Sequence, residues 1–179
     1  FKLLHKIPKF IQEKFISPVA DLNELKKNPL KITEFWNSAQ QRINLDNKIN
    51  FFKTHNACVS YKERWFTDEV NTVGYIYVVR DPRSIACSLA SHSKISIEQA
   101  VDDLLNESNM GLNGPYKLAE FPGSWKINYL SWKKKKKFEG IIIKYEDLID
   151  NTENELKKIL FFLNKFKKID INETRVSKS

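Results

Sequence analysis

The chain has only two cysteines among its 179 residues, Cys58 and Cys87, and their spacing is not that of a metal site. Two cysteines cannot build the disulfide framework of a small secreted domain, so the sequence favours a reducing compartment and a cytoplasmic location. No apolar run approaches the ~20 residues that a membrane-spanning helix needs. We also find no secretory signal, because residues 1–15 are rich in lysine and are interrupted by Pro8.

Acidic residues are outnumbered by basic ones. The chain has 22 Asp and Glu residues against 30 Lys and Arg residues, which gives a net charge of +8. This balance favours an anionic partner, such as nucleic acid, a membrane surface or a phosphorylated small ligand. The length is typical of one domain, here residues 1–179, with enough chain to bury a hydrophobic core.

Residues 74–92 predict a buried strand followed by a helix. The run at 75–79 is wholly apolar or aromatic, which is typical of a strand covered on both faces in a parallel sheet. Asp81 and Pro82 then predict a helix start, as the N-cap and the first helical residue. The free N–H groups and the positive dipole of that helix would lie above the sheet edge.

Two arginines and a serine lie at this junction of strand and helix. Arg80 and Arg83 carry fixed charges with fork geometry, and Ser88 adds a hydroxyl two turns into the helix. The three side chains suit an anion, above all a phosphate. A surface arginine pair at an ordinary strand–helix turn is the alternative interpretation.

Two further runs predict strands that end in polar residues. Residues 49–53 lead into Lys53, Thr54 and His55, and residues 140–144 lead into Tyr145. In open parallel sheets, ligands bind outside the carboxyl ends of the strands. The sequence therefore predicts an α/β fold with a central parallel sheet and a ligand site at one edge of it.

Three segments carry signals for the start of a helix. Residues 96–99 and 152–155 have the pattern of a capping box, and Ser124 precedes a third helical segment. The aromatic residues that follow Ser124 at helical spacing are expected in the core rather than in a base-stacking platform. A turn at residues 113–115 separates the first and third of these helices.

Residues 133–137 are five consecutive lysines. Such a run could contact nucleic acid or anionic lipid. No arginine or aromatic residue is interleaved with the lysines, so we favour a solvated helix end whose cations complement the C-terminal dipole.

Four blocks of the sequence, taken in order, resemble the sulfotransferase family. They are KTHNA at 53–57, YIYVVRDPRSIACSLASH at 75–92, PGSWKINYLSW at 122–132 and IIIKYEDLIDNTENELKKILFFL at 141–163. The resemblance is to the cytosolic-type branch, whose donor is 3′-phosphoadenosine 5′-phosphosulfate. It implies a P-loop-type three-layer fold, a small-molecule acceptor and no metal.

The resemblance also implies roles for five residues. His55 would remove the proton from the acceptor hydroxyl or amine, and Lys53 would lie near the transferring sulfuryl group. Arg80 and Ser88, eight positions apart, would hold the 3′-phosphate of the donor. Tyr145 would contact the adenine region.

Parts of the family pattern are not found in the chain. These are the donor-binding loop of Lys-Ser-Gly-Thr-Thr-Trp type, which follows a first strand, and a C-terminal Arg-Lys-Gly segment. We therefore expect an internal fragment of a longer enzyme, lacking the first strand and inactive by itself. Asn56 and Ala57 also depart from the Leu-Pro that often follows the histidine in animal enzymes, which bears on the acceptor pocket.

Two other classes of function fit part of the sequence. A nucleotide-kinase-like enzyme would share the sheet and the phosphate site, although the spacing from Arg80 to Ser88 argues for sulfuryl transfer. A basic nucleic-acid-binding module would show affinity that falls steeply with salt. A sulfotransferase would instead bind adenosine 3′,5′-bisphosphate as a discrete ligand, with no nucleic-acid partner.

Overall fold

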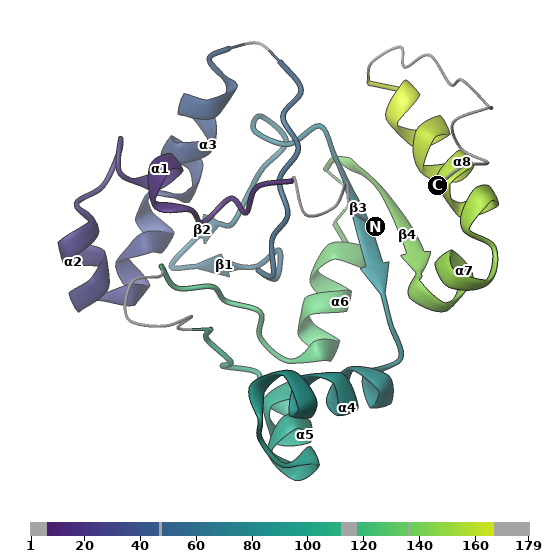
Figure 1. The fold of residues 1–179 in the computed structure, drawn as a ribbon. Helices are drawn as coiled ribbons and strands as arrows, with labels where there is room; N and C mark the ends of the chain where they lie inside the picture. Colours follow the sequence, from purple (N-terminus) through teal and green to yellow (C-terminus); the bar gives the residue numbers. More distant parts are fainter. Residues whose placement is uncertain (1–6, 47, 112–117, 136, 167–179) are drawn as a thin grey trace.

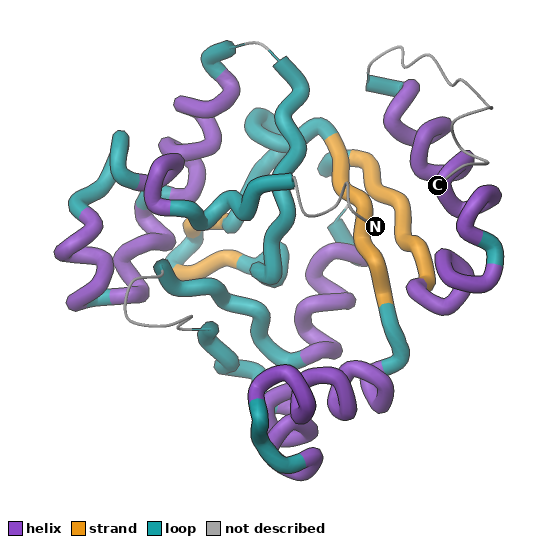
Figure 2. The backbone as a smooth tube through the Cα atoms, viewed as in Figure 1, coloured by secondary structure: helices purple, strands orange, loops and turns teal. Residues whose placement is uncertain are grey.

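The computed structural model describes residues 7–46, 48–111, 118–135 and 137–166. Figure 1 shows a helical N-terminal region on one side, two long neighbouring strands, and helices packed around those strands. Helix and loop make up most of the described chain (Figure 2). The turn predicted at residues 113–115 lies outside the described residues.

The central sheet consists of two parallel strands, β3 (Gly74–Val79) and β4 (Glu139–Lys144). The apolar runs predicted both strands, and the structure confirms them together with their parallel arrangement. The register pairs Gly74 with Glu139 and Val79 with Lys144, so the two carboxyl ends lie at the same edge.

One face of this sheet is covered by α6 (Trp125–Lys133). Tyr75 and Tyr77 point from β3 toward this helix. The Tyr75 hydroxyl donates to the carbonyl oxygen of Trp132 at 2.7 Å, and the Tyr77 hydroxyl donates to Oδ1 of Asn128 at 3.0 Å. Two hydrogen bonds from alternate residues of one strand therefore fix the helix on the sheet.

The opposite face is partly covered by α8 (Thr152–Asn164), which follows α7 (Tyr145–Asp150). An ideal Cβ on Gly74 would lie 3.1 Å from the ring of Phe162, so helix and strand approach closely at this end. Farther along the same face, Ile76 and Val78 are exposed, at 36% and 48%. Helices on both faces of a parallel sheet are compatible with the α/β fold that the sequence predicts.

The predicted starts of three helices are confirmed, at α4 (Pro82–Ser93), α5 (Ile97–Leu105) and α6. The side chains of Asp81, Ser96 and Ser124 each accept a hydrogen bond from a backbone N–H two or three residues farther on, at 2.8 to 3.2 Å. These caps could be predicted because donor and acceptor are close together in the sequence.

The strand predicted at residues 49–53 is wrong. The segment is extended, but only Lys53 forms a bridge, a parallel one opposite Lys9: its carbonyl accepts from the N–H of Phe10 at 3.2 Å, and its N–H donates to the carbonyl of Pro8 at 3.0 Å. A strand needs a ladder of backbone partners, and an apolar run alone does not supply one.

The capping box predicted at residues 152–155 is also wrong. Thr152 is already inside α8, and Asn151, the residue before it, provides no side-chain cap. The Thr152 hydroxyl donates instead to the carbonyl oxygen of Leu148, at 2.7 Å, because only one residue separates α7 from α8 and the last turn of α7 lies within reach.

The main hydrophobic core lies between α6 and the N-terminal half of the chain. That half contains α1 (Glu13–Ile16), α2 (Leu22–Lys27), the 3₁₀ helix η2 (Pro29–Glu34), α3 (Trp36–Asn44), and the antiparallel hairpin of β1 (Ser60–Tyr61) and β2 (Arg64–Trp65). Phe66 links the two halves, with its ring 5.3 Å from that of Trp36 and 6.3 Å from that of Trp132. The prediction that aromatic residues after Ser124 belong to the core is thus confirmed for Trp132.

Candidate functional site

Arg80 and Tyr145 lie together at the carboxyl ends of the two parallel strands. The register that ends with Val79 opposite Lys144 places the next residue of each strand side by side. The guanidinium carbon of Arg80 lies 4.6 Å from the centre of the Tyr145 ring, which is a cation–π contact. In the part of the chain that the structure describes, Arg80 forms no ion pair, so its charge can meet an anionic ligand.

Arg83, by contrast, is paired with Asp81. Its Nε and Nη2 atoms donate to the Asp81 carboxylate at 3.0 and 2.5 Å, and its side chain is 90% exposed. The hydrogen bonds from Arg83 lower the pKa of Asp81 to about 2, so this carboxylate is charged at neutral pH. Asp81 also accepts from the first turn of α4, so a carboxylate of the chain itself occupies part of the helix N-terminus where the sequence predicted an anion.

Ser88 lies on the exposed side of α4. Ala86 and Ala90 are buried toward α5, and Ser88, two residues from each, lies on the opposite side of the helix. No hydrogen bond joins Ser88 to Arg80 within the described residues. Any pairing of the two would therefore be made through a ligand.

Lys53 and His55 lie on the extended segment that follows residue 50. The bridge to Lys9 anchors the backbone of Lys53, and both Lys53 and His55 are exposed. Alternate residues of an extended chain point to the same side, so the structure presents the two side chains on one surface.

His55 is connected to β3 through a single asparagine. Nδ2 of Asn128 donates to the carbonyl oxygen of His55 at 3.0 Å, and Oδ1 of Asn128 accepts from the Tyr77 hydroxyl at 3.0 Å. Tyr77 lies three residues before Arg80 on the same strand. Two hydrogen bonds and a short piece of strand therefore connect the histidine with the arginine.

A buried carboxylate lies among the basic groups around His55. Glu120 is 3% exposed, and one of its oxygens lies 3.4 Å from Nζ of Lys9. Although His55 itself is exposed, desolvation by neighbouring protein atoms lowers its pKa; Glu120 opposes this shift, and Lys9 and Lys53 add to it. The imidazole is therefore neutral near pH 7, the form that can accept a proton.

Asn56 has a structural role next to His55. It is 1% exposed, and its Oδ1 accepts from the backbone N–H of Phe121 at 2.6 Å. Its carbonyl oxygen accepts from the indole N–H of Trp132 at 3.0 Å. Thus the departure from Leu-Pro at this position supplies a buried amide that joins the segment to its neighbours.

Three residues near His55 could not be identified from the sequence alone: Glu120, Lys9 and Asn128. Each is far from its partner along the sequence and is brought near His55 only when the chain folds. Asn128 is 73 positions from His55, and Lys9 is 111 positions from Glu120. The single available signal was the polar Asn128 on the otherwise aromatic face of its helix, and that signal does not specify a partner.

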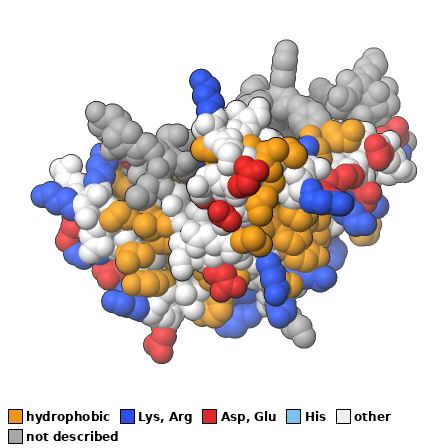
Figure 3. Space-filling view, turned by 90° about the horizontal axis from the view of Figure 1, so that it is seen from below, with side chains coloured by type: hydrophobic (Ala, Val, Ile, Leu, Met, Phe, Trp, Pro, Cys, Tyr) orange, Lys and Arg blue, Asp and Glu red, His pale blue; other side chains and the backbone are white. Residues whose placement is uncertain are grey.

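The lysine run lies where α6 ends, as the favoured interpretation predicts. α6 ends at Lys133; beyond it, Nζ of Lys135 lies 3.9 Å from the centre of the Trp65 ring, and Nζ of Lys137 lies 3.0 Å from Oε1 of Glu69. On the face seen in Figure 3, the basic side chains of the described residues are scattered among acidic and apolar ones.

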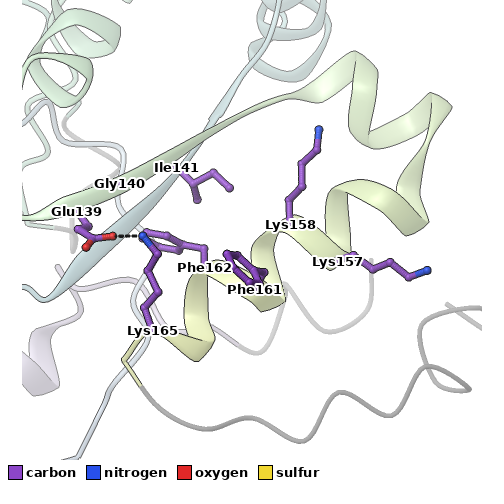
Figure 4. A pocket seen from close by; sticks show the side chains of 8 residues that line it. All are labelled: Glu139, Gly140, Ile141, Lys157, Lys158, Phe161, Phe162 and Lys165. Atoms are coloured by element: carbon purple, nitrogen blue, oxygen red, sulfur yellow. Dashed lines mark hydrogen bonds and ion pairs between the residues drawn. The ribbon is translucent and has the colours of Figure 1, made fainter.

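A groove of about 500 Å³ lies between β4 and α8 (Figure 4). Ile141, Phe161 and Phe162 contribute apolar surface to it, and Lys165 closes one end through an ion pair with Glu139 at 2.6 Å. The groove lies toward the amino end of β4, away from the edge that carries Tyr145. None of the candidate site residues lines it.

The described residues contain no group of three or more histidine, cysteine or acidic side chains that could hold a metal ion. No described helix is long and apolar enough to cross a membrane. Cys58 and Cys87 are free thiols, and burial raises the pKa of Cys58 to about 11.

Two comparisons with known proteins bear on this site. The family model described as "Sulfotransferase domain" matches residues 4–178, which is nearly the whole chain. The match includes both strands of the sheet and every candidate site residue. No curated protein is significantly similar to the chain in sequence.

Proposed function

The chain belongs to the sulfotransferase family, and from that premise we propose that it transfers a sulfuryl group from 3′-phosphoadenosine 5′-phosphosulfate to a hydroxyl or amine of a small acceptor. In this proposal residues 1–179 belong to one P-loop-type domain of a cytoplasmic enzyme, and no metal takes part. The sulfur forms a bond to the acceptor as its bond to the phosphate oxygen of the donor breaks, and adenosine 3′,5′-bisphosphate leaves. Such an in-line displacement depends on positioning and on electrostatic stabilisation.

The observation that carries the proposal is the stack of Arg80 on Tyr145 at the sheet edge. A guanidinium presents a fork of N–H donors that suits the 3′-phosphate of the donor, and stacking limits the freedom that the arginine would lose on binding. The neighbouring tyrosine ring offers an aromatic surface to the adenine. Ser88 is assigned the second contact to the 3′-phosphate.

His55 is assigned the role of general base. A neutral imidazole near pH 7 can take the proton from the acceptor O–H or N–H as the new bond to sulfur forms. Lys53, two residues earlier on the same surface, is assigned to the sulfuryl oxygens, where its positive charge would offset the negative charge of the transition state.

Two alternatives make different predictions. A nucleotide-kinase-like enzyme would bind ATP in preference to adenosine 3′,5′-bisphosphate. A nucleic-acid-binding module would bind an oligonucleotide with affinity that falls steeply with salt. The family match favours sulfuryl transfer over both. On the face seen in Figure 3, the scattered basic side chains of the described residues also form no continuous basic stripe of the kind that contacts nucleic acid.

The test is calorimetric titration of the full-length protein with adenosine 3′,5′-bisphosphate. Replacing Arg80 by alanine removes a charge-assisted hydrogen bond worth about 1.5–3 kcal/mol, so the dissociation constant should rise by about 10- to 150-fold. The matched control is Arg83→Ala, because that arginine is paired with Asp81. Unchanged affinity in Arg80→Ala, or an equal loss in Arg83→Ala, would contradict the assignment.

A further inference from the structure

We infer that Asn128 is a positioning residue for His55. Tyr77 holds the Asn128 side chain by a hydrogen bond, and Asn128 in turn fixes the backbone of His55 relative to β3. This inference rests on the proposed function, in which His55 has the role of general base. It concerns residues that the family resemblance left without a role.

The amide of Asn128 uses all three of its polar groups. Its two N–H groups donate to the carbonyl oxygens of His55, at 3.0 Å, and of Pro122, at 2.8 Å. Its oxygen accepts from the Tyr77 hydroxyl at 3.0 Å. Only an amide in this one orientation provides two donors and one acceptor in these directions, so the side chain at this position is specified by chemistry and not by size alone.

The segment that contains His55 is hydrogen-bonded to α6 at three residues. Asn128 contacts the carbonyl of His55, the Trp132 indole N–H contacts the carbonyl of Asn56, and the Ser131 hydroxyl accepts from the N–H of Cys58 at 2.9 Å. The bond at His55 is the one nearest to the imidazole. None of the described residues hydrogen-bonds the imidazole itself, so the position of the ring depends on where its backbone is held.

Tyr77 connects this arrangement to the sheet, because its hydroxyl holds the Asn128 side chain. It lies on β3, three residues before Arg80, so one strand positions both the arginine and, through Asn128, the histidine. Burial raises the pKa of Tyr77 to about 12, so its hydroxyl stays protonated and remains a donor at any pH at which the protein would be assayed. A displacement of about 1 Å at a reacting group can reduce turnover by about 100-fold.

The test, made in the full-length protein, compares Tyr77→Phe and Asn128→Asp with Lys126→Ala, an exposed control on the same helix. We expect both test variants to reduce kcat by about 10- to 100-fold. The dissociation constant of adenosine 3′,5′-bisphosphate should stay within about twofold of wild type, and Lys126→Ala should match wild type in both measurements. If Asn128→Asp fails to fold, Tyr77→Phe, which removes a single oxygen, carries the test.

A double-mutant cycle separates positioning from a general effect on the fold. If Asn128 and Tyr77 act only through His55, then Tyr77→Phe should change kcat little in a His55→Ala background. An equal loss in both backgrounds, or normal kcat in Tyr77→Phe, would overturn the inference and leave the proposed function intact. Normal turnover in His55→Ala alone would instead contradict the general base of the proposed function.

Discussion

Replacing Gly140 by alanine should strongly destabilise the protein. An ideal Cβ at this position would lie 2.0 Å from the ring of Tyr75, whereas carbon atoms in contact are about 3.5–4.0 Å apart. The Tyr75 ring cannot move away freely, because its hydroxyl donates to the carbonyl of Trp132 and its ring lies 5.1 Å from the Trp132 ring.

The expected cost follows from these two contacts. Overpacking costs about 1–3 kcal/mol, and loss of the partly buried hydrogen bond from Tyr75 costs up to about 1–3 kcal/mol more. Gly140→Ala should therefore lower the free energy of unfolding by about 2–6 kcal/mol, measured by urea denaturation monitored by circular dichroism. In a Tyr75→Leu background the added methyl should cost less than about 1 kcal/mol, because the ring is no longer there. A Gly140→Ala protein as stable as wild type, or an equal cost in both backgrounds, would refute this reasoning.

Three further predictions concern the candidate site. His55→Ala should reduce turnover by about two to four orders of magnitude and leave the affinity for adenosine 3′,5′-bisphosphate unchanged; a His55→Asn enzyme with a normal rate would exclude the role of base. Glu120 opposes the lowering of the pKa of His55, so Glu120→Gln should lower that pKa further and move the acidic limb of the kcat/KM profile to lower pH. A shift of this limb to higher pH would show that Glu120 does not raise the pKa of His55. Asn56→Ala leaves the N–H of Phe121 without its partner and should cost about 1–3 kcal/mol in urea unfolding; a cost below about 0.5 kcal/mol would contradict the role given to this amide.

The depressed pKa of His55 also has a consequence for stability. The unfolded chain, with an ordinary histidine pKa of about 6.5, binds a proton more readily than the folded protein does. Folding stability should therefore rise as the pH increases through the range just below 6.5, and this part of the dependence should disappear in His55→Asn. Thermal unfolding of the wild type and of His55→Asn, measured at a series of pH values from 5 to 7, tests this pH dependence.

The elements predicted correctly are those whose signals are local. The run at β3 is apolar throughout, and Asp81 and Pro82 follow it directly, so the strand, the turn and the start of α4 could all be predicted from adjacent residues. Their placement at the carboxyl edge also brought Arg80 and Tyr145 together, because parallel strands end at the same edge of a sheet.

The predictions that failed depended on partners elsewhere in the chain. Residues 49–53 have the composition of a strand, but strand formation requires neighbouring backbone, and within the described residues only the short stretch 8–10 provides it, at Lys53 alone. The hydroxyl of Thr152 could accept from the backbone N–H of residue 155, as in a capping box, or donate to a carbonyl of the preceding helix, and in the fold it donates to Leu148. Asn128 stood out as a polar residue on an aromatic helix face, but that signal did not specify its partners, which lie on β3 and next to residue 55.

Tyr75 and Tyr77 contact α6 from alternate positions of β3, and this double attachment has a mechanical consequence. A helix fixed at two points to a strand cannot slide or rotate against it without breaking both hydrogen bonds. Arg80 on the strand and His55 beside the helix should therefore move as parts of one rigid body during thermal fluctuations, with a constant separation. Under the proposed function, a constant separation of Arg80 and His55 would limit the acceptors to those that can place a nucleophile beside His55 while the donor is bound.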